Sequence, residues 1–399
     1  MAPKEMVTKV RLKNYRSIAA CEVSPGSLMF LVGPNGSGKS NFLDAFRFVS
    51  EGLRTSIDHA MRRRGGINQV RRRSTGHPTH FGMRFDLRLL AGPARYAFDI
   101  GAAADGGFVI LRETCVCGPH RFERRLKDGA EEVTSSMTTP MPRVLGDRLL
   151  LVGMSGTPEF RPVFDFLSRM EVYNLNPDVI REPQAPDAGD VLLRDGANVA
   201  SALSRLKLRD EGSMNRAAEY LRAIVPDIVG AERKAIGSRE TIEFTQLVEG
   251  SKHPWRFDAA NMSDGTLRAL AVLVALFQGL SEQHVSLIGI EEPEIALHPG
   301  AAGALRDALL EAANHRQVLV TSHSPELLDS LEISDEQLVS VVSEGGRTLV
   351  SGLDAKTRAV LRQRLFTAGE LLKRGQLEPD KEAAVVDPEQ LSLFDGDAE

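Results

Sequence analysis

A glycine-rich octapeptide constrains the fold of this chain more than any other feature. Residues 33 to 40 read GPNGSGKS, which matches the spacing G-x-x-x-x-G-K-[ST]. The apolar run SLMFLVG precedes the motif and a helical pattern begins near Lys39, so the order strand, loop, helix is predicted. The chain is therefore expected to contain an α/β unit built around this loop.

The residue types in the loop suit phosphate binding. Glycines allow backbone amides to wrap phosphate oxygens, and the following helix N-terminus favours an anion. Lys39 is expected to reach the β- and γ-phosphates and Ser40 to ligate Mg²⁺, so ATP and Mg²⁺ are the expected cofactors. The candidate nucleotide-contacting residues are Asn35, Gly36, Ser37, Gly38, Lys39, Ser40 and Asn41.

A second acidic motif follows a later apolar strand pattern, SLIGI, which ends in Glu291-Glu292-Pro293. Glu291 is expected to hold Mg²⁺ through water, at a position where P-loop proteins more often have Asp. Glu292 is expected to orient or deprotonate the attacking water. The alternative is a charged strand end on a solvated loop.

Two further segments fit the same site. His323 follows the strand pattern QVLVTS, 31 residues after Glu292, where it could contact the γ-phosphate; the alternative is an ordinary surface or core histidine. The sequence NMSDGT, residues 261 to 266, precedes an apolar helix, and Ser263 or Asp264 could cap that helix.

The order of NMSDGT, IEEPE, LHP and TSHSP resembles the motif set of ABC ATPases. This resemblance implies that Ser263 and Gly265 close over the γ-phosphate of nucleotide bound to another subunit, in an ATP-dependent head-to-tail homodimer. The sequence departs from the family's usual LSGGQ, most clearly at Asp264 and Thr266, but keeps S-x-G.

The spacing separates the branches of that family. Ser263 lies 223 positions after Ser40, much further than in transporter subunits, and heptad repeats of an SMC-type arm are lacking. The segments VRLKNYRSI, GPNGSGKSN, IEEPEIALHP and TSHSPELL look like the RecF-type and OLD-type ATPases that act on DNA in bacteria. OLD-type nucleases append a Toprim domain, whereas 76 residues follow His323 here, so the RecF type is the closer match.

The predicted fold is α/β, a P-loop ABC-type ATPase head with an inserted antiparallel β-sheet, a helical lobe and a disordered acidic C-terminal tail. Alternating segments between His80 and Lys127 indicate the inserted sheet. The head is expected to span residues 1–375, with lobes at 1–130, 131–260 and 261–375. Residues 131–195 give little pattern beyond helical spacing from Glu159 to Met170.

Arginines gather just after the first helical pattern, although the whole chain has a net charge of −5. Arginine forks suit phosphate oxygens, so this cluster predicts DNA contact; the alternative is a solvated loop or pairing with carboxylates. The candidates are Arg62, Arg63, Arg64, Arg71, Arg72 and Arg73, and Gln69 is a candidate metal-sensing glutamine of the family.

Residues 376–399 carry eight acidic residues and one lysine, which predicts a flexible, solvated tail. Within it, QLSLF looks like the peptide by which bacterial repair proteins dock on the DNA polymerase sliding clamp. Gln390, Leu391, Leu393 and Phe394 are its candidate contacts. The alternative is a tail that folds back on the domain.

Three functions remain open at this point. The first is a repair or replication ATPase whose ATP-dependent dimer closes over DNA, and the second is an ATPase scaffold of a phage-defence system with a separate effector. A stand-alone nuclease would need a second acidic metal cluster, and the sequence shows none. The most apolar stretch, Leu270 to Leu280, is too short for a membrane span, and the N-terminus lacks a signal-peptide pattern, so a cytoplasmic location is expected.

Overall fold

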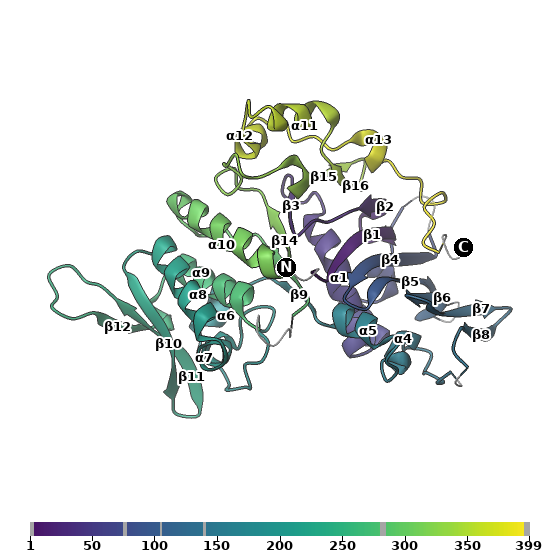
Figure 1. Cartoon of the computed structure of the whole chain (residues 1–399), viewed down its shortest axis with the longest axis horizontal. Coiled ribbons are helices and arrows are strands. Elements are labelled where there is room, and N and C mark those ends of the chain that lie inside the picture. The colour runs from purple at the N-terminus through teal and green to yellow at the C-terminus, as the bar shows by residue number, and fades with distance from the viewer. Residues whose placement is uncertain (1–3, 75–77, 104–105, 139–140, 280–284, 395–399) are drawn as a thin grey trace. The chain divides into compact units, whose positions relative to one another are not determined.

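The computed structural model describes residues 4–74, 78–103, 106–138, 141–279 and 285–394. The chain separates into two compact units, each assembled from segments that are distant in sequence (Figure 1). Unit 1 comprises Met1–Met170, Ser334–Leu365 and Gly375–Glu399, and unit 2 comprises Glu171–Ile333 and Phe366–Arg374.

A long sheet forms the frame of unit 1, with strand order β8-β7-β6-β5-β4-β1-β2-β16-β15-β3. Its strands are β1 (Met6–Tyr15), β2 (Ile18–Val23), β3 (Leu28–Val32), β4 (His80–Leu89), β5 (Gly92–Ala102), β6 (Phe108–Cys117), β7 (His120–Lys127), β8 (Ala130–Ser135), β15 (Leu338–Glu344) and β16 (Arg347–Gly352). The pairs from β4 to β8 are antiparallel, whereas β15 pairs in parallel with β3. The predicted inserted antiparallel sheet is therefore confirmed.

Aromatic side chains fill the core between α1 and this sheet. Phe46 of α1 packs edge-on against Phe85 of β4, with ring centroids 5.4 Å apart. Phe48 contacts Phe81 of β4 in the same way, at 5.6 Å. Each fully buried side chain of this kind contributes roughly 1.5–3 kcal/mol, so these contacts fix α1, and with it the loop that precedes α1, on the sheet.

The helices of unit 1 are α1 (Lys39–Arg54), α2 (Ile57–Arg62), α3 (Ile67–Val70), α4 (Leu150–Met154), α5 (Arg161–Ser168), α11 (Ala355–Arg362) and α13 (Lys381–Ala384). Helix α5 lies within the stretch from Glu159 to Met170 that has helical spacing. The start of α4 is held by a buried carboxylate, because Glu113 of β6 accepts hydrogen bonds from the amides of Leu150 and Leu151 at 2.6 and 2.9 Å. Burial raises the pKa of Glu113.

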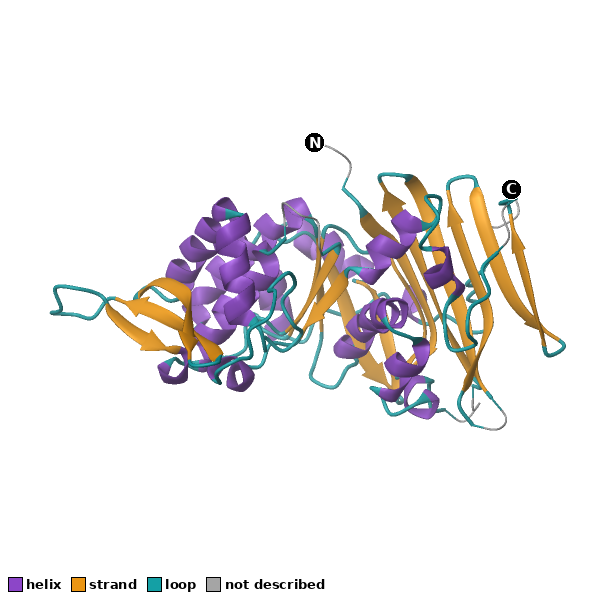
Figure 2. Cartoon of the chain, turned by 90° about the horizontal axis from the view of Figure 1, so that it is seen from below, coloured by secondary structure: helices purple, strands orange, loops and turns teal. Residues whose placement is uncertain are grey.

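Unit 2 combines a helical cluster with short strands, and Figure 2 shows the β10–β12 sheet beside the helices of this unit. Its helices are α6 (Pro177–Arg181), α7 (Val199–Arg209), α8 (Glu211–Ile224), α9 (Asp264–Phe277), α10 (Ala302–His315) and α12 (Ala368–Lys373). Its strands are β10 (Ile228–Ile236), β11 (Arg239–Gln246), β12 (Trp255–Asp258), β13 (Leu287–Glu291) and β14 (Gln317–Ser322), and β9 (Met170–Tyr173) begins at the boundary. Strands β13 and β14 run parallel, with Glu291 opposite Thr321.

The acidic tail differs from the flexible segment expected from the sequence. Between Gln376 and Phe394 it packs on unit 1, and Leu391 and Leu393 are buried at 7% and 3% exposure. The physical reason is the apolar island, whose burial outweighs solvation of the neighbouring acids. The last five residues, 395–399, lie outside the described part of the chain.

Candidate nucleotide site

The glycine-rich loop joins β3 to α1, as the sequence predicted, and its backbone depends on Gly38. This residue has φ 107°, in the left-handed region that glycine adopts without strain. A Cβ atom on Gly38 would stand 2.2 Å from the hydroxyl oxygen of Thr348. The loop therefore tolerates no side chain at this position.

Lys39 is buried and folds back over the loop. Its Nζ donates hydrogen bonds to the carbonyl oxygens of Gly33 and Pro34 at 2.8 and 3.0 Å. The first amides of α1 have no intrahelical acceptor, as at any helix start. The buried hydroxyl oxygen of Ser37 has no hydrogen-bond partner among the described residues. An ammonium group, helix amides and an unpaired hydroxyl form a donor set that fits phosphate oxygens.

Thr348 of β16 braces the loop from the far end of the sequence. Its hydroxyl donates to the carbonyl of Ser37 at 2.9 Å and lies 2.7 Å from the hydroxyl oxygen of Ser17. The Asn41 amide donates to the same Ser17 oxygen at 2.6 Å. This chain of hydrogen bonds connects the β1–β2 turn, the loop and β16. Thr348 could not be identified as a functional residue from the sequence, because no motif marks it.

Arg64, one of the predicted DNA contacts, is instead a buried structural residue. Its guanidinium donates to both carboxylate oxygens of Asp44, at 2.8 and 2.9 Å, and to Glu51 at 2.6 Å. Burial by itself would raise the pKa of Asp44, but the hydrogen bond and charge of Arg64 outweigh burial and lower that pKa. With 3% of its side chain exposed, Arg64 cannot present its fork to a phosphate at the surface.

The other arginines of the cluster have different surroundings. Arg62 and Arg63 are exposed at 79% and 54%, and Arg62 pairs with Asp58 one turn earlier. Arg71 and Arg72 are half-buried, and Arg73 is exposed. Gln69 is exposed on α3. Arg62, Arg63 and Arg73 are thus the members of this cluster that offer an accessible positive charge.

The acidic motif lies at the end of β13 in unit 2. Glu291 accepts from the guanidinium of Arg194 at 3.2 Å. Glu292 has φ 46°, a rare conformation for a residue with a side chain, and its amide donates to the Thr321 carbonyl at 3.0 Å. The Nδ1 atom of His323 lies 3.3 Å from the Glu292 carboxylate. The structure therefore brings together the two residues predicted to be catalytic, and it holds Glu292 in a strained backbone position.

Two further charged residues, Glu294 and Arg268, influence the electrostatics of this motif and were not singled out from the sequence. Glu294 accepts from the Ser322 hydroxyl at 2.6 Å and from the His323 amide at 3.3 Å. Burial raises the pKa of Glu294 despite these hydrogen bonds. Arg268 of α9 is 7% exposed; burial lowers its pKa, while the negative charges of Glu294 and Glu292 oppose that shift. Glu294 and Arg268 thus adjust the electrostatics around Glu292.

Helix α9 is capped at its N-terminus by Ser263. Its hydroxyl accepts from the Thr266 amide at 3.2 Å, which decides between the two caps that the sequence allowed. Arg181 donates to the Met262 carbonyl at 3.2 Å and also pairs with Asp264. Gly265 is buried, and a Cβ there would stand 2.4 Å from the carbonyl oxygen of Ala296. Close packing on the loop after β13 therefore requires the glycine of S-x-G.

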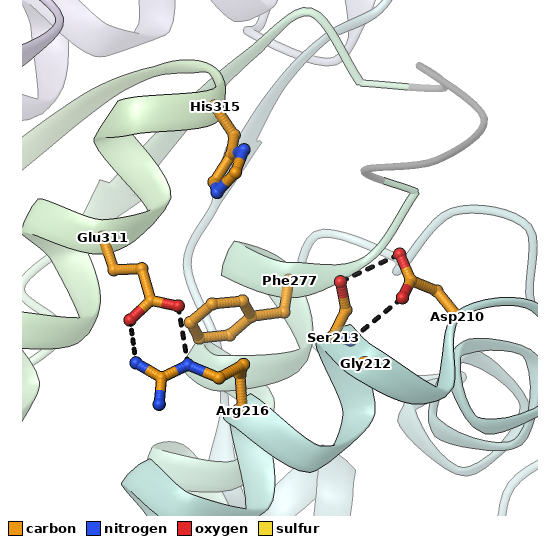
Figure 3. Close-up of a pocket in the computed structure, with 7 residues that line it drawn as sticks. All are labelled: Asp210, Gly212, Ser213, Arg216, Phe277, Glu311 and His315. Carbon is orange, nitrogen blue, oxygen red and sulfur yellow. Dashed lines mark hydrogen bonds and ion pairs between the residues drawn. The ribbon is translucent and has the colours of Figure 1, made fainter.

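A pocket of unit 2 lies among α8, α9 and α10, away from these motifs (Figure 3). Its volume is about 340 Å³. The guanidinium of Arg216 on α8 donates to Glu311 on α10 at 2.8 Å, and Glu311 also accepts from the Tyr220 hydroxyl at 2.7 Å. Because these charges neutralise one another, we assign the pair to helix packing rather than to ligand binding.

Within the described ranges, no three His, Cys, Asp or Glu side chains converge in a way that could hold a metal ion. None of the helices in those ranges is long and apolar enough to cross a membrane.

Comparison with solved structures identifies the fold. The head of an Smc protein bound to the C-winged helix domain of ScpA has a TM-score of 0.56 at 14% identity, and the match covers 89% of this chain and 99% of that chain. A Smc head domain with an extended coiled coil from Pyrococcus furiosus gives 0.54 at 12%, over 90% and 99%. One from Pyrococcus yayanosii gives 0.50 at 13%, over the same shares. These likenesses confirm the predicted fold class, a P-loop ATPase head of the ABC type.

No curated protein matches the chain. A family described as "AAA domain, putative AbiEii toxin, Type IV TA system" matches residues 28–128 and 156–329. These residues include the glycine-rich loop, the segment before α9, the acidic motif and His323. With most of its length matched, the chain belongs to this AAA-domain family.

Proposed function

We propose that this protein binds ATP with the glycine-rich loop and hydrolyses it with Glu292 as the group that orients or deprotonates water. The observation that carries the proposal is the donor set of the loop, where the Lys39 ammonium lies over the carbonyls of Gly33 and Pro34. On binding, phosphate oxygens would replace these carbonyls as its partners. His323, 3.3 Å from Glu292, is suited to hold that carboxylate and to contact the γ-phosphate.

Mg²⁺ fits the proposed donors, because hydroxyl and carboxylate oxygens are the ligands it prefers. Ser40 and Glu291 would hold it, and the ion would neutralise charge on the β- and γ-phosphates. Arg194 pairs with Glu291 in the structure at 3.2 Å, so it orients that carboxylate. Gln69 is the residue proposed to sense the metal.

We further propose that ATP joins two copies head to tail, through Ser263 and Gly265. Ser263 is exposed at the start of α9, where free amides favour an anion. The packing of Gly265 on Ala296 would transmit a shift of the loop after β13 to this helix start.

DNA is the proposed substrate of the dimer, in a RecF-like role in repair or replication. The exposed charges of Arg62, Arg63 and Arg73 support this role, and Arg71 and Arg72 are secondary candidates. Docking of the tail on the sliding clamp is a further part of this proposal, and it requires that Leu391 and Leu393 leave their buried positions.

A second candidate is an ATPase scaffold in a phage-defence system. It is favoured by the family description, which names a toxin of a type IV toxin–antitoxin system. The same ATP-driven dimerisation would then control a separate effector, and DNA would have no effect on hydrolysis.

The test is the ATPase rate against protein concentration, with and without duplex and single-stranded DNA. Lys39→Ala should abolish nucleotide binding, and Glu292→Gln should bind ATP but hydrolyse it at least about a hundredfold more slowly. A rate that rises more than linearly with protein would support the dimer. Normal ATP affinity of Lys39→Ala would refute the assignment of the loop.

Changing Arg62 and Arg63 together to Glu separates the two functions. Loss of DNA stimulation in this variant supports a DNA-gated ATPase. The matched control changes Arg161 and Arg169 together to Glu, because these two arginines are also exposed and also pair with a nearby carboxylate. A rate that ignores DNA in the wild type favours the defence scaffold.

A further inference from the structure

A notch in one face of the unit 1 sheet holds the C-terminal segment 390–394. Along β4, Phe81 and Phe85 point towards α1, so Gly82 faces the opposite side of the sheet. Gly82 lies between Lys13 of β1 and Asp99 of β5 in register, and Asp99 pairs in turn with Arg112 of β6. The missing side chain of Gly82 therefore leaves a gap in a row of long charged residues.

The segment enters this gap through Leu393. Its Cδ1 atom lies 2.3 Å from the point that a Cβ on Gly82 would occupy, so any larger residue at position 82 would displace it. Arg11 donates to the Ser392 carbonyl at 3.0 Å. The guanidinium of Arg112 stacks over the ring of Phe394, 4.1 Å from its centroid. One apolar, one backbone and one cation–π contact thus hold three consecutive residues.

The segment is held by these local contacts rather than by opposite net charges. At the rim of the notch, Arg11 also pairs with Glu22 and Arg112 also pairs with Glu123, and segment 390–394 contains no charged residue. Beneath Leu393, Asp99 is largely buried and its Oδ1 atom lacks a hydrogen-bond partner among the described residues. Leaving a polar group unpaired costs free energy, so the contact is weaker than burial of two leucines alone would make it.

We propose that the notch is a peptide-binding site, that segment 390–394 is its built-in ligand, and that the segment exchanges between the notch and solution. Leu391, Leu393 and Phe394 are also the side chains proposed to dock on an external partner, whose identity rests on the proposed function. One side chain cannot occupy two pockets. Occupation of the notch therefore excludes partner docking, and release of the tail permits it.

The experiment uses the full-length chain with Leu393→Asp, which expels the tail from the notch. A fluorescent peptide of residues 386–399 is titrated to millimolar concentration, the range set by a tethered competitor, and its anisotropy is followed. We expect the variant to bind the wild-type peptide about tenfold or more tightly than the wild-type chain does, because the notch is empty. A peptide that itself carries Leu393→Asp should not bind.

Two further variants keep the test decisive. Leu365→Asp changes an exposed leucine of unit 1 and should bind the peptide no better than the wild type. Arg112→Ala keeps both leucines and should speed amide exchange of residues 391–394 by loss of the stacking contact. The proposed peptide-binding site would be refuted if the wild type and Leu393→Asp bound the peptide equally well. It would also be refuted if amide exchange of residues 391–394 were unchanged in Arg112→Ala. Neither assay contains nucleotide, so their failure leaves the ATPase proposal intact.

Discussion

The hydroxyl of Thr348 donates to the carbonyl of Ser37 over 2.9 Å and so joins β16 to the phosphate loop. The same threonine limits the space at Gly38, where a Cβ would stand 2.2 Å from its hydroxyl oxygen. The loop is therefore shaped by a residue that belongs to none of the recognised motifs.

Thr348→Val should weaken ATP binding up to about tenfold, because a buried hydrogen bond contributes about 0.5–1.5 kcal/mol and the Ser37 carbonyl loses its partner. Titration of a fluorescent ATP analogue measures this change. Thr348→Ser keeps the hydroxyl and should retain most of the affinity. Equal affinities of the valine and serine variants would show that the hydroxyl does not support the loop.

Arg64→Ala should destabilise unit 1 by roughly 1.5–3 kcal/mol, since Asp44 and Glu51 lose the charged hydrogen bonds of Arg64 and keep their partners Arg16 and Arg47. The exposed pair of Arg62 with Asp58 predicts at most about 1 kcal/mol for Arg62→Ala. Chemical denaturation of both variants compares the two. Similar losses would mean that Arg64 is not buried in solution.

Asp44 should contribute a stability that disappears in acid. Its folded-state pKa is lowered by Arg64, so the contribution is complete above the unfolded-state pKa of about 3.9 and is lost as pH falls through the folded-state pKa. Free energies of unfolding between pH 7 and pH 3 should therefore fall less steeply below about pH 4 in Asp44→Asn than in the wild type. If the free energy of unfolding falls equally steeply below about pH 4 in both proteins, Asp44 does not contribute to the loss of stability in acid.

Gly265→Ala should destabilise unit 2 by about 1–3 kcal/mol, because the added methyl group meets the Ala296 carbonyl at 2.4 Å. Gly303→Ala on α10 is the control, since its nearest neighbour would be the Arg306 guanidinium at 3.7 Å. That change should stabilise slightly, through the higher helix propensity of alanine. Thermal unfolding measures the change in stability of both variants, and the two changes are expected to have opposite signs.

The elements that carry the motifs were predictable because their signals are local. The loop after β3, the end of β13 and the strand before His323 each follow from a few neighbouring residues whose periodicity changes at a glycine or a charge. Ser263 as a helix cap is equally local. The fold class followed from the order of these segments.

Contacts between distant segments could not be predicted in this way. Thr348 lies 311 positions after Ser37, and Arg194 lies 97 positions before Glu291, so no window of sequence contains either pair. The arginine run shows the same limit. Arg62 and Arg64 have identical side chains two positions apart, and only the turn after α2, which places Arg64 against Asp44, makes one structural and the other exposed.

The position of Thr348 in the sequence also determines when the loop gains its support during protein synthesis. The ribosome completes the glycine-rich loop early, but the hydroxyl that supports it is translated 311 residues later. A nascent chain, or one terminated before position 348, therefore carries the phosphate-binding sequence without this support, and the loop gains its full affinity for nucleotide only after Thr348 has been translated.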